Sequence, residues 1–172
     1  MIINNKEAEL DGLLTIAKLM LVSARTAPKG RGSDSVVTAI LTGEEKQKLS
    51  NTMTEQGNRR DALSIDSSGP VVLIGVNTPE DLPDWERDMK LMDLGIAAGS
   101  AVKTAMIHNT DNRIMLSAAR IAKALGFINA DHVLAIPLAV SGKNVFFDRS
   151  GVYTRRDPTG YSYEYLEAYE KK

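Results

Sequence analysis

The chain has 172 residues, of which 43% are hydrophobic and 25% are charged, and this composition is typical of one ordinary folded domain. Its 21 basic and 22 acidic side chains leave no excess of positive charge, which argues against a nucleic acid as partner. The chain contains no cysteine, so it can form neither a disulfide nor a thiolate-ligated zinc or iron–sulfur centre. Its two histidines do not make a metal site by themselves, and we expect no metal.

Targeting and membrane signals are missing from the sequence. Residues 1–12 show no basic segment followed by an apolar stretch, so they do not resemble a secretory signal. The longest apolar runs are far too short to span a bilayer. We therefore expect a cytoplasmic protein without a membrane span.

The first half of the chain predicts a long helix, a strand, a polar helix and a second strand. Between residues 7 and 27 apolar side chains recur at steps of three and four, which indicates a helix that ends at Pro28. Val36–Leu41 is short and β-branched enough for a buried strand, and residues 44–56 suit a polar helix. The apolar run Val71–Val76 predicts a strand in the middle of a sheet.

The second half predicts a short helical turn at residues 78–81 and a long helix over residues 87–107. Gly95 and Gly99 give that helix a small-residue face, which predicts a tight contact with a neighbouring helix or a second chain. Residues 109–112 resemble a turn that caps a further helix over residues 113–125. The last two predicted strands are residues 132–140 and 145–148. Together these elements predict helices packed on a mixed sheet in a single domain.

The predicted domain covers residues 1–149, and residues 150–172 form a separate tyrosine-rich arm. All five tyrosines lie in this arm, between Tyr153 and Tyr169. The arm is too polar to make a core, but tyrosine is favoured at interfaces. Two interpretations stay open, a loose tail and an arm packed on its own or a partner subunit.

The turn after the first helix places three cations, Arg25, Lys29 and Arg31, beside Gly30 and Gly32. Glycines let backbone N–H groups approach an anion, and the cations supply charge and directional donors. The pattern therefore suits a phosphate, including that of a flavin. A solvated basic turn would have the same composition, so that interpretation also stays open.

The other candidate motifs assign no catalytic or binding residue. Residues 95–104 do not have the glycine and lysine spacing of a phosphate-binding loop. We interpret His108, at a helix C-terminus, and His132, at the start of a strand, as structural residues. No carboxylate pair or Ser–His–Asp set identifies itself, so no catalytic residue is assigned.

Six blocks of the sequence carry a resemblance, at residues 24–32, 71–76, 93–105, 111–113, 136–138 and 141–144. In this order they resemble an uncharacterised prokaryotic family described as containing a ferredoxin domain. The resemblance covers about residues 7–149. Relatives in that family carry a cysteine-rich insert where this chain has only residues 77–87, so we expect no iron–sulfur cluster here.

More distantly, the same blocks resemble the FMN-dependent nitroreductases. In that family a buried helix ends in an Ala-Pro turn that contacts flavin, as Ala27-Pro28 would, and a later helix opens with the pattern found at residues 93–97. The resemblance implies a nitroreductase-like α+β fold and FMN bound at a homodimer interface. The residues that it implies for cofactor binding are Arg25, Lys29, Gly30, Arg31, Gly32, Lys143 and Arg149.

The resemblance implies an FMN-binding flavoprotein which, if active, reduces a small acceptor with electrons from NAD(P)H. A flavin performs the redox chemistry itself, so the lack of an evident acid, base or nucleophile does not contradict this function. Whether the protein is an enzyme stays open. The alternative is a non-enzymatic module that has lost flavin and binds another anionic ligand or a protein partner.

Overall fold

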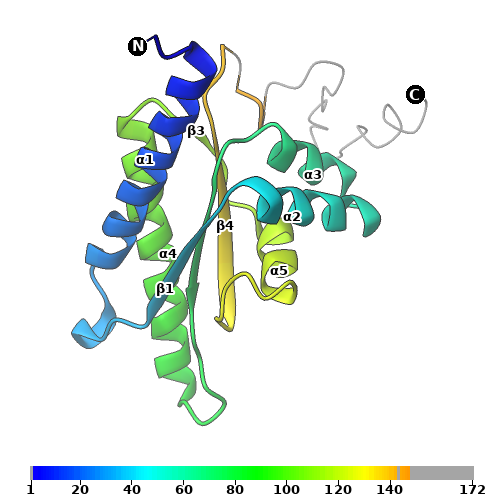
Figure 1. Ribbon diagram of the computed structural model, residues 1–172. Coiled ribbons are helices and arrows are strands. Elements are labelled where there is room, and N and C mark those ends of the chain that lie inside the picture. Colours follow the sequence, from blue (N-terminus) through cyan, green and yellow to red (C-terminus); the bar gives the residue numbers. More distant parts are fainter. Residues whose placement is uncertain (1, 143, 148–172) are drawn as a thin grey trace, which may run out of the picture.

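The computed structural model describes residues 2–142 and 144–147, which form helices packed on both faces of one sheet (Figure 1). The sheet has the strand order β1-β2-β4-β3, and each neighbouring pair runs antiparallel. Within the described residues the fold is thus α+β in a single domain, as expected. The strands are β1 (Val36–Leu41), β2 (Val71–Val76), β3 (Asp111–Asn112) and β4 (His132–Ala139).

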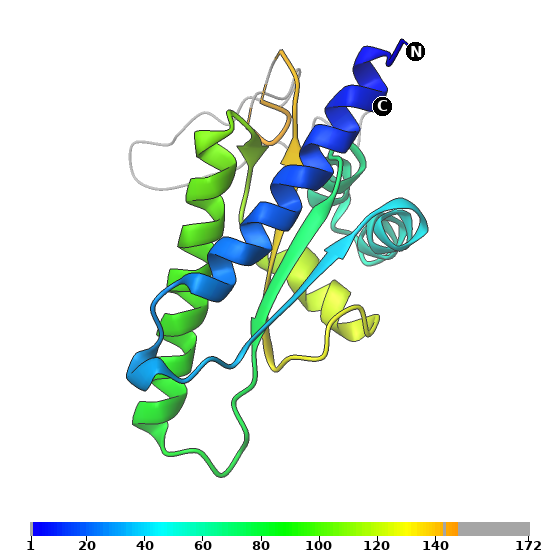
Figure 2. The ribbon, with the colours of Figure 1, turned by 60° about the vertical axis from the view of Figure 1, so that its left-hand side comes forward.

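One face of the sheet is covered by two long helices, α1 (Asn5–Thr26) and α4 (Asp84–Ile107), which lie side by side in Figure 2. Small buried side chains on both helices, such as Ala17, Ala98 and Ala101, let their backbones approach each other and the sheet. Ser23 and Thr104 join the two helices through a hydroxyl–hydroxyl hydrogen bond of 2.6 Å.

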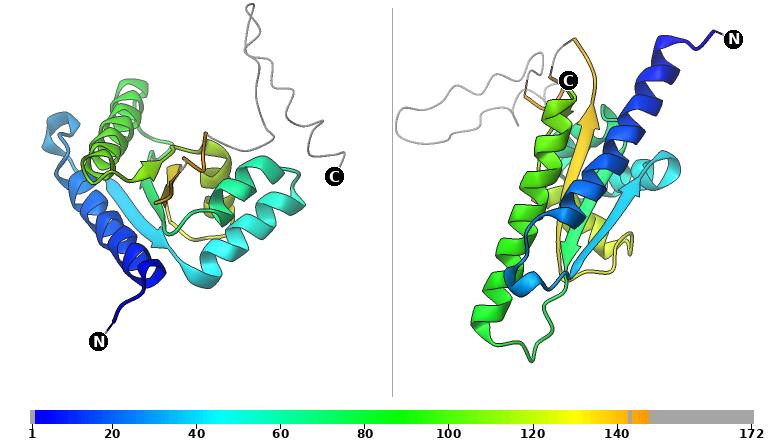
Figure 3. Two further views of the ribbon diagram at one scale, coloured as in Figure 1. Left: turned by 90° about the horizontal axis from the view of Figure 1, so that it is seen from above. Right: turned by 90° about the vertical axis from the view of Figure 1, so that its left-hand side faces the viewer.

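The opposite face is covered by α2 (Gly43–Glu55), α3 (Arg59–Asp66) and α5 (Leu116–Ala124), so the domain has three layers (Figure 3). Because successive side chains of a strand point to opposite faces, Val72 and Ile74 of β2 pack on the α1/α4 side. Leu73 packs on the other side, against Leu49 and other apolar residues of these shorter helices. Every residue of β2 is buried, as its apolar run predicted.

Three local predictions differ from the structure. Helix α3 was not predicted, because its eight residues are mostly polar and bury only Ala62, Ser64 and Ile65. Asp111–Asn112 forms a strand rather than the expected capping turn, because β4 offers it a partner, and α5 begins only at Leu116. The predicted strand at residues 145–148 is wrong where it is described, since the Asn144 side-chain oxygen accepts from the Phe146 N–H and folds this segment into a turn.

The tight contact predicted for Gly95 and Gly99 does not exist within the chain. A Cβ atom added at either position would meet no atom within 4 Å, because both glycines lie on the exposed face of α4. Contact with a second chain stays a prediction. The predicted tyrosine-rich arm, residues 150–172, lies outside the described residues.

Candidate functional site

The predicted anion-binding turn connects α1 to β1 and contains the short helix η1 (Gly30–Gly32). The Lys29 ammonium donates to the carbonyl oxygens of Ala24, Arg25 and Ala27 at 2.8, 2.5 and 2.7 Å. Carbonyls at a helix C-terminus lack partners within the helix and carry partial negative charge, so Lys29 satisfies the end of α1. Its three protons are all engaged within the chain.

The other two cations of the turn also have partners within the chain. Arg25 forms an ion pair with Asp34 at 2.5 Å. Burial by itself raises the pKa of Asp34, but hydrogen bonds from Arg25 and the Val36 N–H lower it below its ordinary value. The Arg31 guanidinium lies 4.5 Å from the centroid of the Trp85 ring, where a cation–π interaction stabilises it.

These contacts change the reason for expecting an anion at the turn. The close spacing of the three cations does not by itself require an anion, because each cation already has a partner in the chain. Arg31 remains the cation best placed to meet a ligand, since it is exposed and its partner is an uncharged ring that is 50% exposed.

Asp93 of α4 holds the turn in place, a role that the sequence did not suggest. Its side chain is only 3% exposed, and its Oδ1 accepts a hydrogen bond from the Gly30 N–H at 2.8 Å. A side chain at Gly30 would collide with the thioether of Met89, so the turn lies directly against α4. One signal in the sequence could have indicated this role: Asp93 lies on the buried face of a predicted helix, and a buried carboxylate requires a hydrogen-bond donor.

The remaining predicted residues, Lys143 and Arg149, lie outside the described residues. Asn144 is described, and its side-chain amide donates to Asp111 of β3 at 2.9 Å, beyond the C-terminal end of β4. The turn lies beside the N-terminal end of β1, at the opposite end of the sheet, as Figures 1 and 3 show. Helix α1 alone is about 33 Å long, so the turn and Asn144 are far apart within one chain.

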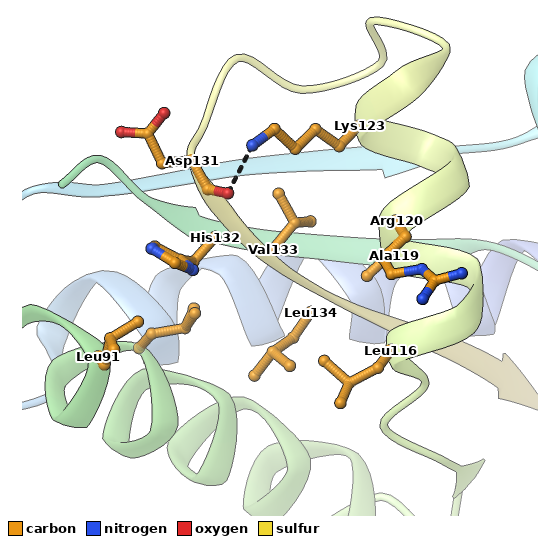
Figure 4. Close-up of a pocket in the computed structure, with 10 residues that line it drawn as sticks. Leu91, Leu116, Ala119, Arg120, Lys123, Asp131, His132, Val133 and Leu134 are labelled. Carbon is orange, nitrogen blue, oxygen red and sulfur yellow. Dashed lines mark hydrogen bonds between the residues drawn. The ribbon is translucent and has the colours of Figure 1, made fainter. Parts of the chain in front are cut away.

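A pocket of about 270 Å³ opens between α4, α5 and the first half of β4 (Figure 4). Of the predicted cofactor-binding residues that the structure describes, none lines it. His132, which we interpreted as structural, lies at its edge, where the ring Nε2 is 3.0 Å from the Thr78 hydroxyl. The sequence could not reveal this pocket, because its walls come from three separated elements: Leu91, Leu94, Leu116, Ala119, Arg120, Lys123, Asp131, His132, Val133 and Leu134.

The layer formed by α1 and α4 exposes several large apolar side chains. On α4, Met92, Ile96 and Met106 are 61%, 45% and 65% exposed, and on α1 Val22 is 58% exposed. Exposed apolar surface of this kind marks surfaces that another molecule covers. The exposed Gly95 and Gly99 lie on the same helix as the three α4 residues.

Two kinds of site are not found among the described residues. No group of three or more histidine and acidic side chains there could hold a metal ion. Within that same part of the chain, no helix combines the length and the apolar character needed to cross a bilayer.

Sequence comparison places the chain in a family. Residues 87–149 match the family described as "uncharacterized protein containing a ferredoxin domain". A protein of the archaeon Archaeoglobus fulgidus is 34% identical over 181 aligned positions, which cover 87% of this chain and 98% of that protein. The chain belongs to this ferredoxin-domain family. As a member without a single cysteine, it lacks the thiolates that ligate iron–sulfur clusters in ferredoxins.

Solved structures show the nitroreductase-like fold of this family member. The NfrA1 nitroreductase of Bacillus subtilis matches with a TM-score of 0.60 and 13% identity, over 83% of this chain and 62% of that one. A nitroreductase-like family protein of Bacillus cereus matches with a TM-score of 0.58 and 15% identity, over 84% of this chain and 80% of that one. A Staphylococcus epidermidis protein with a proposed NAD(P)H:FMN oxidoreductase activity matches with a TM-score of 0.58 and 14% identity, over 76% of this chain and 78% of that one.

Proposed function

We propose that two copies of this protein bind FMN between them and that the complex is a cytoplasmic reductase that uses NAD(P)H to reduce a small acceptor. The observation that carries the proposal is the nitroreductase-like arrangement of α1, its turn, the sheet and α4. Bound FMN would supply the electron transfer, while the protein would bind and orient it. Because the flavin would carry out the redox reaction, the protein would need no acid–base pair of its own.

We propose that the candidate residues reach FMN from two chains. Within one chain, Arg31 lies at one end of the sheet, whereas Asn144 lies at the other end. Because Lys143 is next to Asn144 in the sequence, we propose that the cofactor lies between the turn of one copy and the β4 end of another. On this proposal Arg31, Gly30 and Gly32 would contact the cofactor from one copy, and Lys143 and Arg149 from the other.

The exposed apolar side chains of α4 support the homodimer. Met92, Ile96 and Met106 would be covered by the second copy, and Gly95 and Gly99 would let its backbone come close. We also propose that the tyrosine-rich arm, residues 150–172, lies across the partner. Each of these contacts stabilises the complex through apolar burial.

A second candidate function is favoured by the internal contacts of the turn. Lys29 and Arg25 already bond to helix carbonyls and to Asp34, so neither is free to hold a phosphate without rearrangement. A module that has lost flavin and binds another anionic ligand or a protein partner would show these contacts. Such a module would be non-enzymatic.

Two measurements on the purified full-length chain test the proposal. We expect light scattering to give the mass of a dimer at micromolar concentration, and added FMN to bind with a change in the visible flavin absorption band. A chain that is monomeric and ignores FMN contradicts the proposal and favours the second candidate. Deletion of residues 153–172 should weaken the dimer, and an equally stable truncated dimer would contradict the proposed position of the arm.

A further inference from the structure

The pocket between α4, α5 and β4 is separate from the FMN site proposed above. It lies beside the first half of β4, between α4 on one face of the sheet and α5 on the other, and shares no residue with the turn after α1. Its walls are carbon-rich, since four leucines from three elements line it: Leu91, Leu94, Leu116 and Leu134. At about 270 Å³ it is slightly smaller than the roughly 300–1,000 Å³ of most sites for drug-sized ligands, so it suits a small guest.

Two cations stand at one edge of these apolar walls. Arg120 and Lys123 are three residues apart on α5, so both side chains lie on the same face of the helix, toward the pocket. The Lys123 ammonium donates to the backbone carbonyl of Asp131 at 2.6 Å, which uses one of its three protons. Arg120 makes no hydrogen bond or ion pair with another residue of the described part of the chain.

The acidic residue at the pocket, Asp131, forms no ion pair with either cation. Asp131 accepts a hydrogen bond from the Thr78 N–H at 2.8 Å, and Figure 4 shows its carboxylate at the far edge, turned away from Arg120. The His132 ring lies on the Leu91 side, where it bonds to Thr78. The side of the pocket formed by α5 therefore presents positive charge beside exposed hydrocarbon.

We propose that this pocket binds a small organic anion with an apolar body, such as a medium-chain or aromatic carboxylate. The apolar body would be buried against the leucines, and its carboxylate would pair with the Arg120 guanidinium, whose planar fork matches a carboxylate. A neutral ligand of the same shape would leave Arg120 unpaired and bind less tightly. Inorganic phosphate would leave the apolar walls exposed to water.

Octanoate and 1-octanol form a matched pair of probes, because they have the same chain length and differ in charge. We expect calorimetry on the full-length protein to show octanoate binding with a Kd of about 1 mM or tighter. Octanol should bind about tenfold more weakly, a ratio that corresponds to about 1.4 kcal/mol. Equal affinity for the two probes overturns the role of charge.

Variants of the exposed arginine locate the site. Arg120→Gln should weaken octanoate binding about tenfold without changing octanol binding, and Arg120→Lys should restore part of the loss. Lys103→Gln, an exposed cation of α4 outside the pocket, is the matched control and should leave both affinities unchanged. Unchanged octanoate affinity in Arg120→Gln overturns the proposal.

A lack of octanoate binding also overturns the proposal. That result is expected if the acidic, tyrosine-rich segment at residues 161–170 of the chain itself fills the pocket. FMN binding by Arg120→Gln should equal that of the wild-type chain. The two proposals can thus fail independently.

Discussion

The Asp93 carboxylate and the Gly30 backbone N–H, 63 residues apart in the sequence, are joined by a hydrogen bond of 2.8 Å. Through this bond the central helix α4 fixes the turn that follows α1. Both residues belong to sequence blocks that resemble the ferredoxin-domain family and the nitroreductases. Two of the blocks that carry the family resemblance, residues 24–32 and 93–105, are therefore in direct contact in the fold.

Replacement of Asp93 tests how much this contact stabilises the domain. Asp93→Ala leaves the Gly30 N–H without its acceptor, and we expect a loss of about 1–3 kcal/mol in the free energy of unfolding. Asp93→Asn keeps an oxygen acceptor at the same position and should lose clearly less. Urea denaturation of the two variants checks this, and equal losses would show that the carboxylate charge matters rather than an oxygen acceptor at this position.

Asp61 predicts a pH dependence of stability. Burial by itself raises the pKa of Asp61, but the hydrogen bond from Ser117 and the charges of Arg60 and Arg113 outweigh it, so the pKa lies below the ordinary value. A lowered pKa in the folded state stabilises the protein above the unfolded pKa of about 3.9. This stabilisation is lost as the pH falls through the folded pKa.

The comparison of wild type with Asp61→Asn isolates that effect. We expect the wild type to be the more stable at a pH of about 7, and the difference to shrink below a pH of about 4. Denaturation with urea across this range gives both values. A difference that is constant with pH would mean that the Asp61 charge does not stabilise the fold.

Arg31 is the residue on which proposed FMN binding most depends. If FMN binds, Arg31→Ala should weaken binding by about 1.5–3 kcal/mol, the range for a charge-assisted hydrogen bond. Arg59→Ala, which removes an exposed cation from α3 on the other face of the sheet, should leave FMN affinity unchanged. Titration by flavin fluorescence measures both, and equal affinities would assign Arg31 to the solvated surface.

Gly99 tests whether a second chain covers α4. In a dimer with close backbone contact, Gly99→Leu should overpack the interface and weaken association by roughly 1–3 kcal/mol. Gly12→Leu, at an exposed glycine of α1 that also has no atom near an added Cβ, is the control. Light scattering across protein concentration measures dissociation. A Gly99→Leu variant that only gains thermal stability, as helix propensity predicts for a free surface, rejects the contact.

The sequence by itself determined the elements whose pattern is local. The apolar periodicity of α1 and the uninterrupted apolar run of β2 predicted both elements, because helix and strand faces repeat over a few residues. The composition alone also excluded a thiolate-ligated iron–sulfur cluster, because the chain contains no cysteine. By contrast, the two-residue strand β3 has no local signal, since it exists only through its pairing with β4.

Tertiary structure alone decided what the candidate residues can do. The sequence shows that Lys29 and Arg31 are neighbours, but only the fold turns Lys29 back onto the carbonyls of α1 and places Arg31 over Trp85. The pocket at Arg120 likewise needs α4, α5 and β4 to meet. Packing brings together residues that are far apart in the sequence, and no pattern along the chain specifies which distant side chain meets a given charge.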